Sequence, residues 1–72
     1  MRIFVNDNFK PTRIKNGFSI IGLSKEIGIT KQSLGQIERR VNGISPGNSK
    51  KILELFKVEF DDIFTIVDSK NK

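Results

Sequence analysis

Polar and basic side chains recur along one short stretch, and their types suit hydrogen bonding and charge pairing. Residues 22–40, GLSKEIGITKQSLGQIERR, read as two short amphipathic helices around a glycine-containing turn. The second of these begins with Lys31 and Gln32 and leaves through Gln36, Arg39 and Arg40. Amide and cationic side chains of this kind could enter a DNA groove, or they could meet another protein. These residues alone leave both interpretations open.

Side chains that enzymes use at neutral pH are scarce. The chain has no histidine and no cysteine, which excludes Cys–His pairs, serine–histidine triads, disulfides, and thiolate or imidazole zinc sites. The carboxylates are few and fall mostly in helical or turn contexts. We therefore expect no enzyme activity, no cofactor, no metal and no small-molecule ligand.

The 72 residues allow one small domain, which we place at residues 1–67 and follow with a polar, disordered tail at 68–72. A domain this small buries only about 60% of the surface that its unfolded chain exposes, so we expect marginal stability. Because Trp and Tyr are absent, the core must be built from Ile, Leu, Val and Phe. No apolar run approaches the ~20 residues of a membrane span, and MRIFVND lacks the apolar region of a signal peptide, which indicates an intracellular protein.

The net charge of +5 is unevenly distributed. Residues 1–24 carry four basic and one acidic side chain, a net +3, and residues 25–53 carry six and two, a net +4. Residues 54–72 carry three and five, a net −2. A basic body with an acidic end is expected if one face meets phosphates, but a solvated surface has the same composition.

Apolar spacing and capping residues predict five helices. We place them at about 8–16, 20–27, 31–39 and 49–57, with a short fifth helix that holds Phe60, Ile63 and Phe64. Asn8, Ser19 and Thr30 are suited to N-caps, and the glycines at 17 and 28 to C-caps. NGISPGN, residues 42–48, indicates a loop by its Gly, Pro and Asn content.

Two β-prone segments stand at the ends of the domain. RIFV, residues 2–5, needs a partner to form a strand, and the one comparable segment is FTIV, residues 64–67. We predict that they pair as a small two-stranded ribbon. The alternative is a frayed N-terminus with Phe4 packed on the core.

The helices at 20–27 and 31–39 have the features of a helix-turn-helix unit, in which a short glycine-containing turn joins two helices. Gly28 permits a left-handed backbone in the turn, and Ser24 is small where the helices cross. Ile29, Leu34 and Ile37 are spaced to hold the second helix on the core. The other face of that helix is then presented rigidly to a ligand.

Residues 13–64 resemble the Cro/C1-type helix-turn-helix family, the phage-repressor-like DNA-binding domains. NGFSIIGLSKEIGITKQSLGQIER aligns without gaps to the motif of that family, and VEFDDIF is similar to the start of its last helix. The resemblance implies an all-α, five-helix, lambda-repressor-like domain with a central helix-turn-helix. The two-stranded ribbon from the termini would be an addition to it.

The resemblance also implies a set of contact residues. Side chains at the positions of Lys31, Gln32 and Gln36 reach base edges in the major groove, where Gln suits adenine and Lys suits guanine, and the loop around Asn42 and Gly43 lies near phosphates. The family pairs an arginine of helix 1 with a glutamate of helix 3, which we interpret here as a structural ion pair between Arg13 and Glu38. The full contact surface that we assign, to DNA or to a partner, comprises Lys31, Gln32, Ser33, Gly35, Gln36, Arg39 and Arg40, with Thr30 and Asn42 at the phosphates or the rim.

The sequence departs from the family pattern in three places. Helix 2 of the family usually opens with Gln, which touches the DNA backbone, whereas this chain has Ile20 and Ile21. Ile20 could join the core, while Ile21 falls on the outer half of the helix, and an apolar patch there suits a protein interface. Gly35 stands mid-helix on the outer face, at a cost of about 1 kcal/mol relative to Ala, which suggests close approach or relaxed demands on the helix. Pro46 and Gly47 alter the loop before a fourth helix that we expect to be short.

Chain length, the MRIFVND start and the Ile-rich second helix resemble the modulator-of-repression proteins, the antirepressors of temperate phages of Gram-positive bacteria. This resemblance implies a cytoplasmic regulator of the lysis–lysogeny switch, located with the nucleoid of the bacterial host. It would bind the N-terminal DNA-binding domain of the phage repressor through its helix-turn-helix face.

Two other functions are compatible with the same motif. One is a Cro-like repressor that binds operator DNA by itself as a homodimer; operator DNA could also be bound together with the repressor. The other is an antitoxin, which needs a toxin-binding segment that the five-residue polar tail hardly offers. The operator sequence, the oligomeric state and the identity of the partner do not follow from the sequence.

Overall fold

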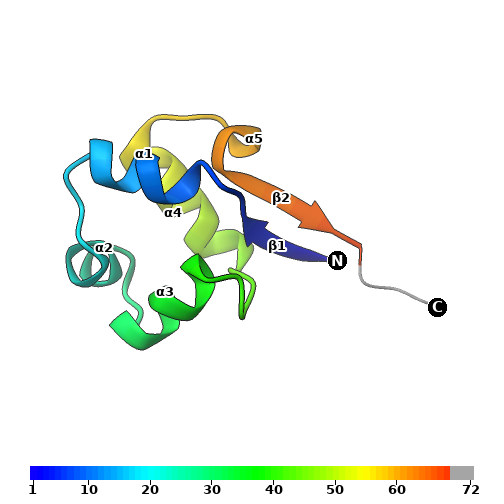
Figure 1. Cartoon of the computed structure of the whole chain (residues 1–72), viewed down its shortest axis with the longest axis horizontal. Helices are drawn as coiled ribbons and strands as arrows, with labels where there is room; N and C mark the ends of the chain where they lie inside the picture. Colours follow the sequence, from blue (N-terminus) through cyan, green and yellow to red (C-terminus); the bar gives the residue numbers. More distant parts are fainter. Residues whose placement is uncertain (69–72) are drawn as a thin grey trace.

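Seven short elements make up the part of the chain that the structure describes. The computed structural model describes residues 1–68, so residues 69–72 of the tail predicted at 68–72 lie outside them. Figure 1 shows the helices gathered into one body from which two strands project as a ribbon. The predicted five helices and terminal ribbon are therefore confirmed. In chain order the elements are β1 Arg2–Val5, α1 Phe9–Lys15, α2 Ile20–Ile27, α3 Lys31–Glu38, α4 Pro46–Phe56, α5 Phe60–Ile63 and β2 Phe64–Val67.

Helices α2 and α3 begin at the predicted N-caps, and α2 ends at the predicted Gly28, whereas α3 ends at Glu38, one residue before its predicted end. Ser19 precedes α2, and its hydroxyl oxygen accepts a hydrogen bond from the Gly22 amide at 2.9 Å. Thr30 caps α3 in the same way and accepts from the Ser33 amide at 3.0 Å. Such caps satisfy amides that the first helical turn leaves without partners. Gly28 ends α2 with a φ of 81°, a left-handed conformation that is readily open to glycine.

Helix α4 begins earlier than predicted. Residues 42–48 indicated a loop with a helix from Ser49, but the helix starts at Pro46. Ser45 is its cap and accepts from the Asn48 amide at 3.2 Å. Proline suits the first helical position because the N–H that it lacks would have no helical partner there. With 11 residues, α4 is not the short helix that the sequence predicted.

The loop before α4 is anchored to β1, a contact that the sequence pattern did not indicate. Ile44 is buried, and its amide donates to the Ile3 carbonyl at 2.8 Å as an isolated bridge. Gly43 lies so close to the strand that a Cβ built on it would sit 2.8 Å from the same carbonyl oxygen. Glycine permits this approach of two backbones, and the segment that follows α3 is thereby fixed to the ribbon.

We expect Gly43→Ala to destabilise the fold. Its Cβ would fall 2.8 Å from the Ile3 carbonyl oxygen, so the backbone would have to move, and overpacking of this kind costs about 1–3 kcal/mol. Gly47→Ala is the matched control, because a Cβ at Gly47 would have nothing within 4 Å. Thermal unfolding followed by circular dichroism should show a clear drop in Tm for Gly43→Ala alone. Equal drops for the two variants would contradict the close contact.

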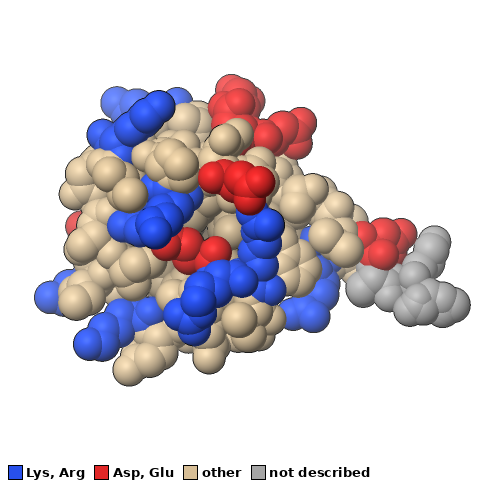
Figure 2. Space-filling view, viewed as in Figure 1, with Lys and Arg blue, Asp and Glu red and all other residues tan. Residues whose placement is uncertain are grey.

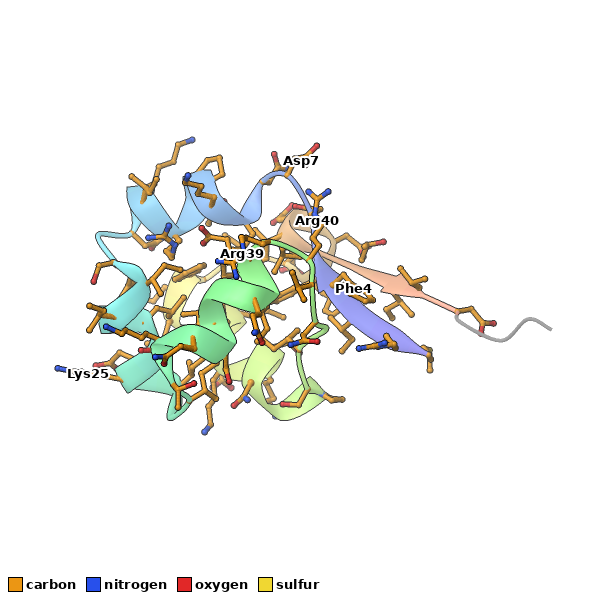
Figure 3. All side chains as sticks on the ribbon, turned by 60° about the horizontal axis from the view of Figure 1, so that its bottom comes forward. Phe4, Asp7, Lys25, Arg39 and Arg40 are labelled. Carbon is orange, nitrogen blue, oxygen red and sulfur yellow. The ribbon has the colours of Figure 1, made fainter. Side chains whose placement is uncertain are left out.

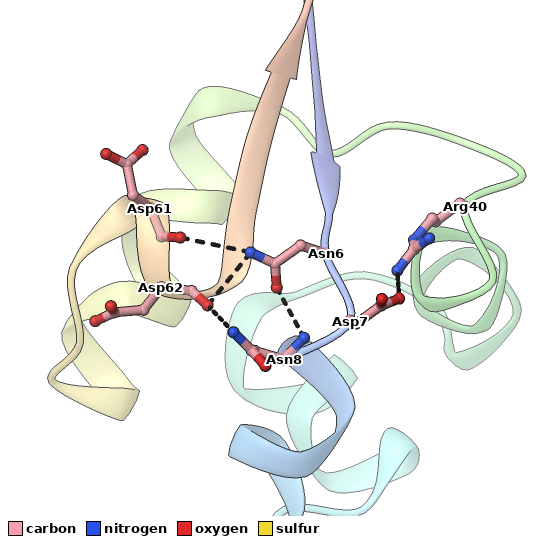
Figure 4. A network of polar contacts seen from close by, with 6 residues as sticks. All are labelled: Asn6, Asp7, Asn8, Arg40, Asp61 and Asp62. Carbon is pink, nitrogen blue, oxygen red and sulfur yellow. Dashed lines mark hydrogen bonds and ion pairs between the residues drawn. The ribbon is translucent and has the colours of Figure 1, made fainter.

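The ribbon confirms the predicted pairing of the two ends of the domain. β1 and β2 are antiparallel, with Val5 opposite Phe64 and Arg2 opposite Val67. Asn8, predicted to cap α1, occupies the cap position but makes no side-chain cap bond. Its Nδ2 instead donates to the Asp62 carbonyl at 3.2 Å, and Nδ2 of Asn6 donates to the same carbonyl at 3.3 Å. The two amides thus join the N-terminal segment to α5 (Figure 4).

The core lies between the helices and the inner side of the ribbon. The ring of Phe9 is at its centre, with centroid distances of 6.2 Å to Phe56 and 6.0 Å to Phe64. Fully burying a side chain of this size contributes about 1.5–3 kcal/mol. Leu34 and Ile37 bury the inner face of α3 in the same core. Because these two residues hold α3 in place, its outer face has a fixed orientation.

Candidate nucleic-acid interface

Helices α2 and α3 form the helix-turn-helix unit, and the turn between them is rigidly bonded. The amides of Gly28 and Ile29 both donate to the Ser24 carbonyl, at 2.9 and 3.0 Å. Ser24 is buried, and its hydroxyl donates to the Ile21 carbonyl at 2.8 Å, so no polar group of that side chain is left without a partner. This bonding follows from the left-handed Gly28, which turns the chain back over the end of α2.

The outer face of α3 brings together five of the seven contact residues that the sequence predicted on and after this helix. Their spacing along the helix places them on one side, and they surround an open hollow together with a side chain of α2. Ser33 is turned away from this face and lines a neighbouring hollow with Asn42 and Gly43. We call the first depression the α3 hollow; it is lined by Ile20, Lys31, Gln32, Gly35, Gln36 and Arg39.

Gln36 is held in place by the segment that follows α3. Nδ2 of Asn42 donates to Oε1 of Gln36 at 2.7 Å, and the Val41 amide donates to the Gln36 backbone carbonyl at 2.9 Å. The sequence placed Asn42 at the phosphates or the rim. The structure places it as a neighbour that orients Gln36, which leaves the amide NH2 of Gln36 as a donor toward a ligand. Spacing in the sequence carried no signal for this contact, because the two residues meet through the loop.

Arg13 and Glu38 form an ion pair beneath the outer face. Nε and Nη2 of Arg13 donate to the two carboxylate oxygens of Glu38 at 2.8 and 3.2 Å, and Nη1 donates to the Phe18 carbonyl at 2.7 Å. Arg13 is only 7% exposed. The guanidinium therefore links α1, the α1–α2 connection and the end of α3, and it is too deeply placed to contact a ligand. Fork-to-fork pairing of this kind fixes geometry as well as charge.

Basic side chains are spread over α1, α2 and α3, and many of the acidic side chains lie near α5 and the start of α1, with others at the centre of this face and beside the end of β2 (Figure 2). Arg39 projects at the end of α3 (Figure 3) and has no ion-pair partner among residues 1–68. Arg40 follows with a left-handed φ of 64°, and its guanidinium pairs with Asp7. Arg39 therefore offers an unpaired cation, while part of the Arg40 charge is engaged within the chain.

The start of α2 is apolar at the edge of this basic face. Ile20 is half-buried and packs against the core, and Ile21 is 48% exposed. Thr30, the other residue predicted near phosphates, is exposed, with its hydroxyl oxygen engaged as the α3 cap. The edge that would face a DNA backbone thus carries aliphatic side chains where a hydrogen-bond donor is expected.

Neither a candidate metal site nor a membrane-spanning helix is present among the described residues. Within residues 1–68, no group of three or more His, Cys, Asp or Glu side chains is arranged to hold a metal ion. Over the same residues, the helices are too short and too polar for any one of them to cross a bilayer.

Comparison with known proteins agrees with this geometry. The family model for the helix-turn-helix domain matches residues 12–63, from within α1 to the end of α5. No curated protein gives a significant match to the chain. Since the family match covers most of the chain and includes the α2–α3 unit, this protein belongs to the Cro/C1-type helix-turn-helix family, whose members are DNA-binding domains and not enzymes.

Proposed function

We propose that this chain is a small phage regulator of the lysis–lysogeny switch that acts on a repressor protein. Its helix-turn-helix face would bind the N-terminal DNA-binding domain of the repressor, in the cytoplasm of the bacterial host and close to the nucleoid. Membership of a DNA-binding family supports transcription regulation in general. The observation that carries the finer proposal is the exposed Ile21, which follows Ile20, the α2 residue that lines the α3 hollow.

Ile21 supports a protein partner because of what a phosphate requires. DNA-backbone contacts are made by cations, hydroxyls, amides and helix N-termini, all of which donate hydrogen bonds. The first amides of α2 are backbone donors at this place, but the Ile21 side chain has no donor, and its apolar surface stays exposed to water until another apolar group covers it. Protein interfaces combine such an apolar anchor with a polar rim. We assign Ile20 and Ile21 as the anchor, and Lys31, Gln32 and Arg39 as part of the rim.

Direct operator binding is the second candidate, and one observation favours it. Gln36 is oriented by Asn42 at 2.7 Å, as a base-reading amide benefits from being. One module of this size reads few base pairs, so this candidate predicts a homodimer on half-sites about 34 Å apart. Lys31 and Arg39 would displace counterions from phosphates, so DNA affinity would fall steeply as salt rises.

Fluorescence anisotropy distinguishes the two candidates. Labelled DNA from the intergenic region beside the gene is titrated with the pure protein at low and at physiological salt, and the resident repressor is then added at equal molarity. We expect no specific binding by the protein alone and a changed repressor titration after mixing. Specific binding by the protein alone, weakened by salt, would replace the proposal with the Cro-like function.

A further inference from the structure

Gly35 stands in the middle of α3, although nothing in the fold requires glycine there. Among the described glycines, only Gly17 and Gly28 have a positive φ. A Cβ built on Gly35 would meet just one atom, Nη1 of Arg39, at the ordinary contact distance of 3.5 Å. Gly43, by contrast, is required by a 2.8 Å approach to backbone. Alanine would fit at position 35 and would favour the helix.

The glycine lies where a side chain would fill the α3 hollow. Lys31, Gln32, Gln36 and Arg39 surround it on the same face of α3, and Ile20 stands opposite on α2. Any side chain at position 35 would therefore occupy part of this depression. Glycine at position 35 weakens the helix but keeps the hollow open. We therefore look for the reason for this glycine in the group that enters the hollow.

We propose that the α3 hollow receives one bulky apolar side chain from a helix of the protein partner, and that Gly35 keeps the hollow open for it. This inference rests on the proposed function and specifies its contact. Ile20 supplies an apolar wall. A phosphate in the same position would face an aliphatic side chain, whereas an apolar group would be covered by it.

The charges around the hollow specify the residues that flank the apolar side chain. Lys31 and Arg39 stand four residues before and four residues after Gly35 on the same helix face. At 1.5 Å per residue their Cα atoms are separated by ~12 Å along the axis of α3. Nη1 of Arg39 lies 3.5 Å from the Cβ position of Gly35, so the guanidinium stands beside the hollow, whereas Lys31 begins about one turn before it. A partner helix lying along α3 would match both cations with one carboxylate close to its apolar residue and a second about one turn away. The partner is thus a helix that carries one bulky apolar residue with two acidic residues near it on the same face.

The first test asks whether the fold needs the glycine. Gly35→Ala is expected to raise Tm by about 4–8 °C, because it removes the helix penalty of glycine in a domain of this size. Gly47→Ala is the control glycine, since a Cβ there would also have open space around it. A lower Tm for Gly35→Ala would overturn the inference, because Gly35 would then serve the fold.

The second test examines the hollow without any partner. The ¹⁵N-labelled protein is titrated with isobutanol as an apolar probe and followed by NMR. We expect saturable shifts at the amides of Ile20, Gly35 and Gln36, their loss in Gly35→Leu, and their persistence in Gly47→Ala. Shifts spread over the surface, or shifts that persist in Gly35→Leu, would overturn the inference.

The third test uses the repressor N-terminal domain and the intergenic DNA with the same variants. Filling the hollow is expected to weaken repressor binding about 10-fold in Gly35→Ala and more than about 100-fold in Gly35→Leu, with Gly47→Ala unchanged. If Gly35→Leu binds the repressor normally, the hollow does not receive a side chain of the partner. If Gly35→Leu keeps repressor binding but loses DNA binding, the hollow contacts DNA and not a protein. If Lys31→Gln and Arg39→Gln bind the repressor as well as the wild type does, the inference that the partner carries acidic residues beside its apolar side chain is wrong. If the wild-type protein does not bind the repressor, the proposed function is wrong. The isobutanol titration would still show whether the hollow binds an apolar group.

Discussion

Ile21→Glu should abolish the complex with the repressor and leave the fold intact. Ile21 is 48% exposed near the start of α2, and a substitution at such a surface position usually changes stability by no more than about 0.5 kcal/mol. A carboxylate in the first turn is even favoured by the helix dipole. In the complex, however, the same charge would be buried without a partner, so we expect affinity to fall about 100-fold or more. Thermal unfolding and anisotropy measure the two effects on the same sample.

Ile66→Glu is the matched control for this prediction. Ile66 is 53% exposed, close to the value for Ile21, but it lies on β2, and Figure 1 places that strand far from α2. This control variant should bind the repressor normally. If Ile21→Glu unfolds the protein, Ile21 belongs to the core and the apolar anchor is misassigned. If the variant folds and still binds, the partner contacts another face.

Glu38→Gln should cost about 3–5 kcal/mol, because it leaves the Arg13 guanidinium buried without its countercharge. Arg13 is 7% exposed and donates to both carboxylate oxygens of Glu38. A domain of 72 residues has a total stability of only about 5–10 kcal/mol, so the variant should keep about 0–7 kcal/mol of it and unfold at a clearly lower urea concentration than the wild type. Urea unfolding followed by circular dichroism gives the free-energy difference directly.

A second ion pair provides the control for Glu38→Gln. Asp7 and Arg40 pair at the surface, with side chains 94% and 48% exposed, so Asp7→Asn should change stability by less than about 1 kcal/mol. Replacing both Arg13 and Glu38 by apolar residues of similar size should restore much of the loss, because no buried charge then remains without a partner. A loss below about 1 kcal/mol for Glu38→Gln would mean that water reaches Arg13 and screens it.

Features that depend on neighbouring residues in the chain could be predicted well. Ser19, Thr30 and Gly28 act within one helical turn, so their roles as caps followed from residue type and position. The inward residues Leu34 and Ile37 followed from helical spacing. The start of α4 was predicted wrongly because the local residues are ambiguous. Proline and glycine after a serine fit both a loop and the first turn of a helix.

The sequence by itself determined α2 and α3, the turn at Gly28 and the residue types on the outer face of α3, because caps and apolar periodicity act over a few residues. Only the tertiary structure decided that Asn42 orients Gln36, that Gly43 meets Ile3, and that Ile20 and α3 enclose one hollow. These contacts join segments whose relative placement depends on packing of the whole core. Contacts between segments that are distant in the sequence leave no periodic pattern in it. The position of Gly35 in the hollow could therefore be seen only in the folded structure.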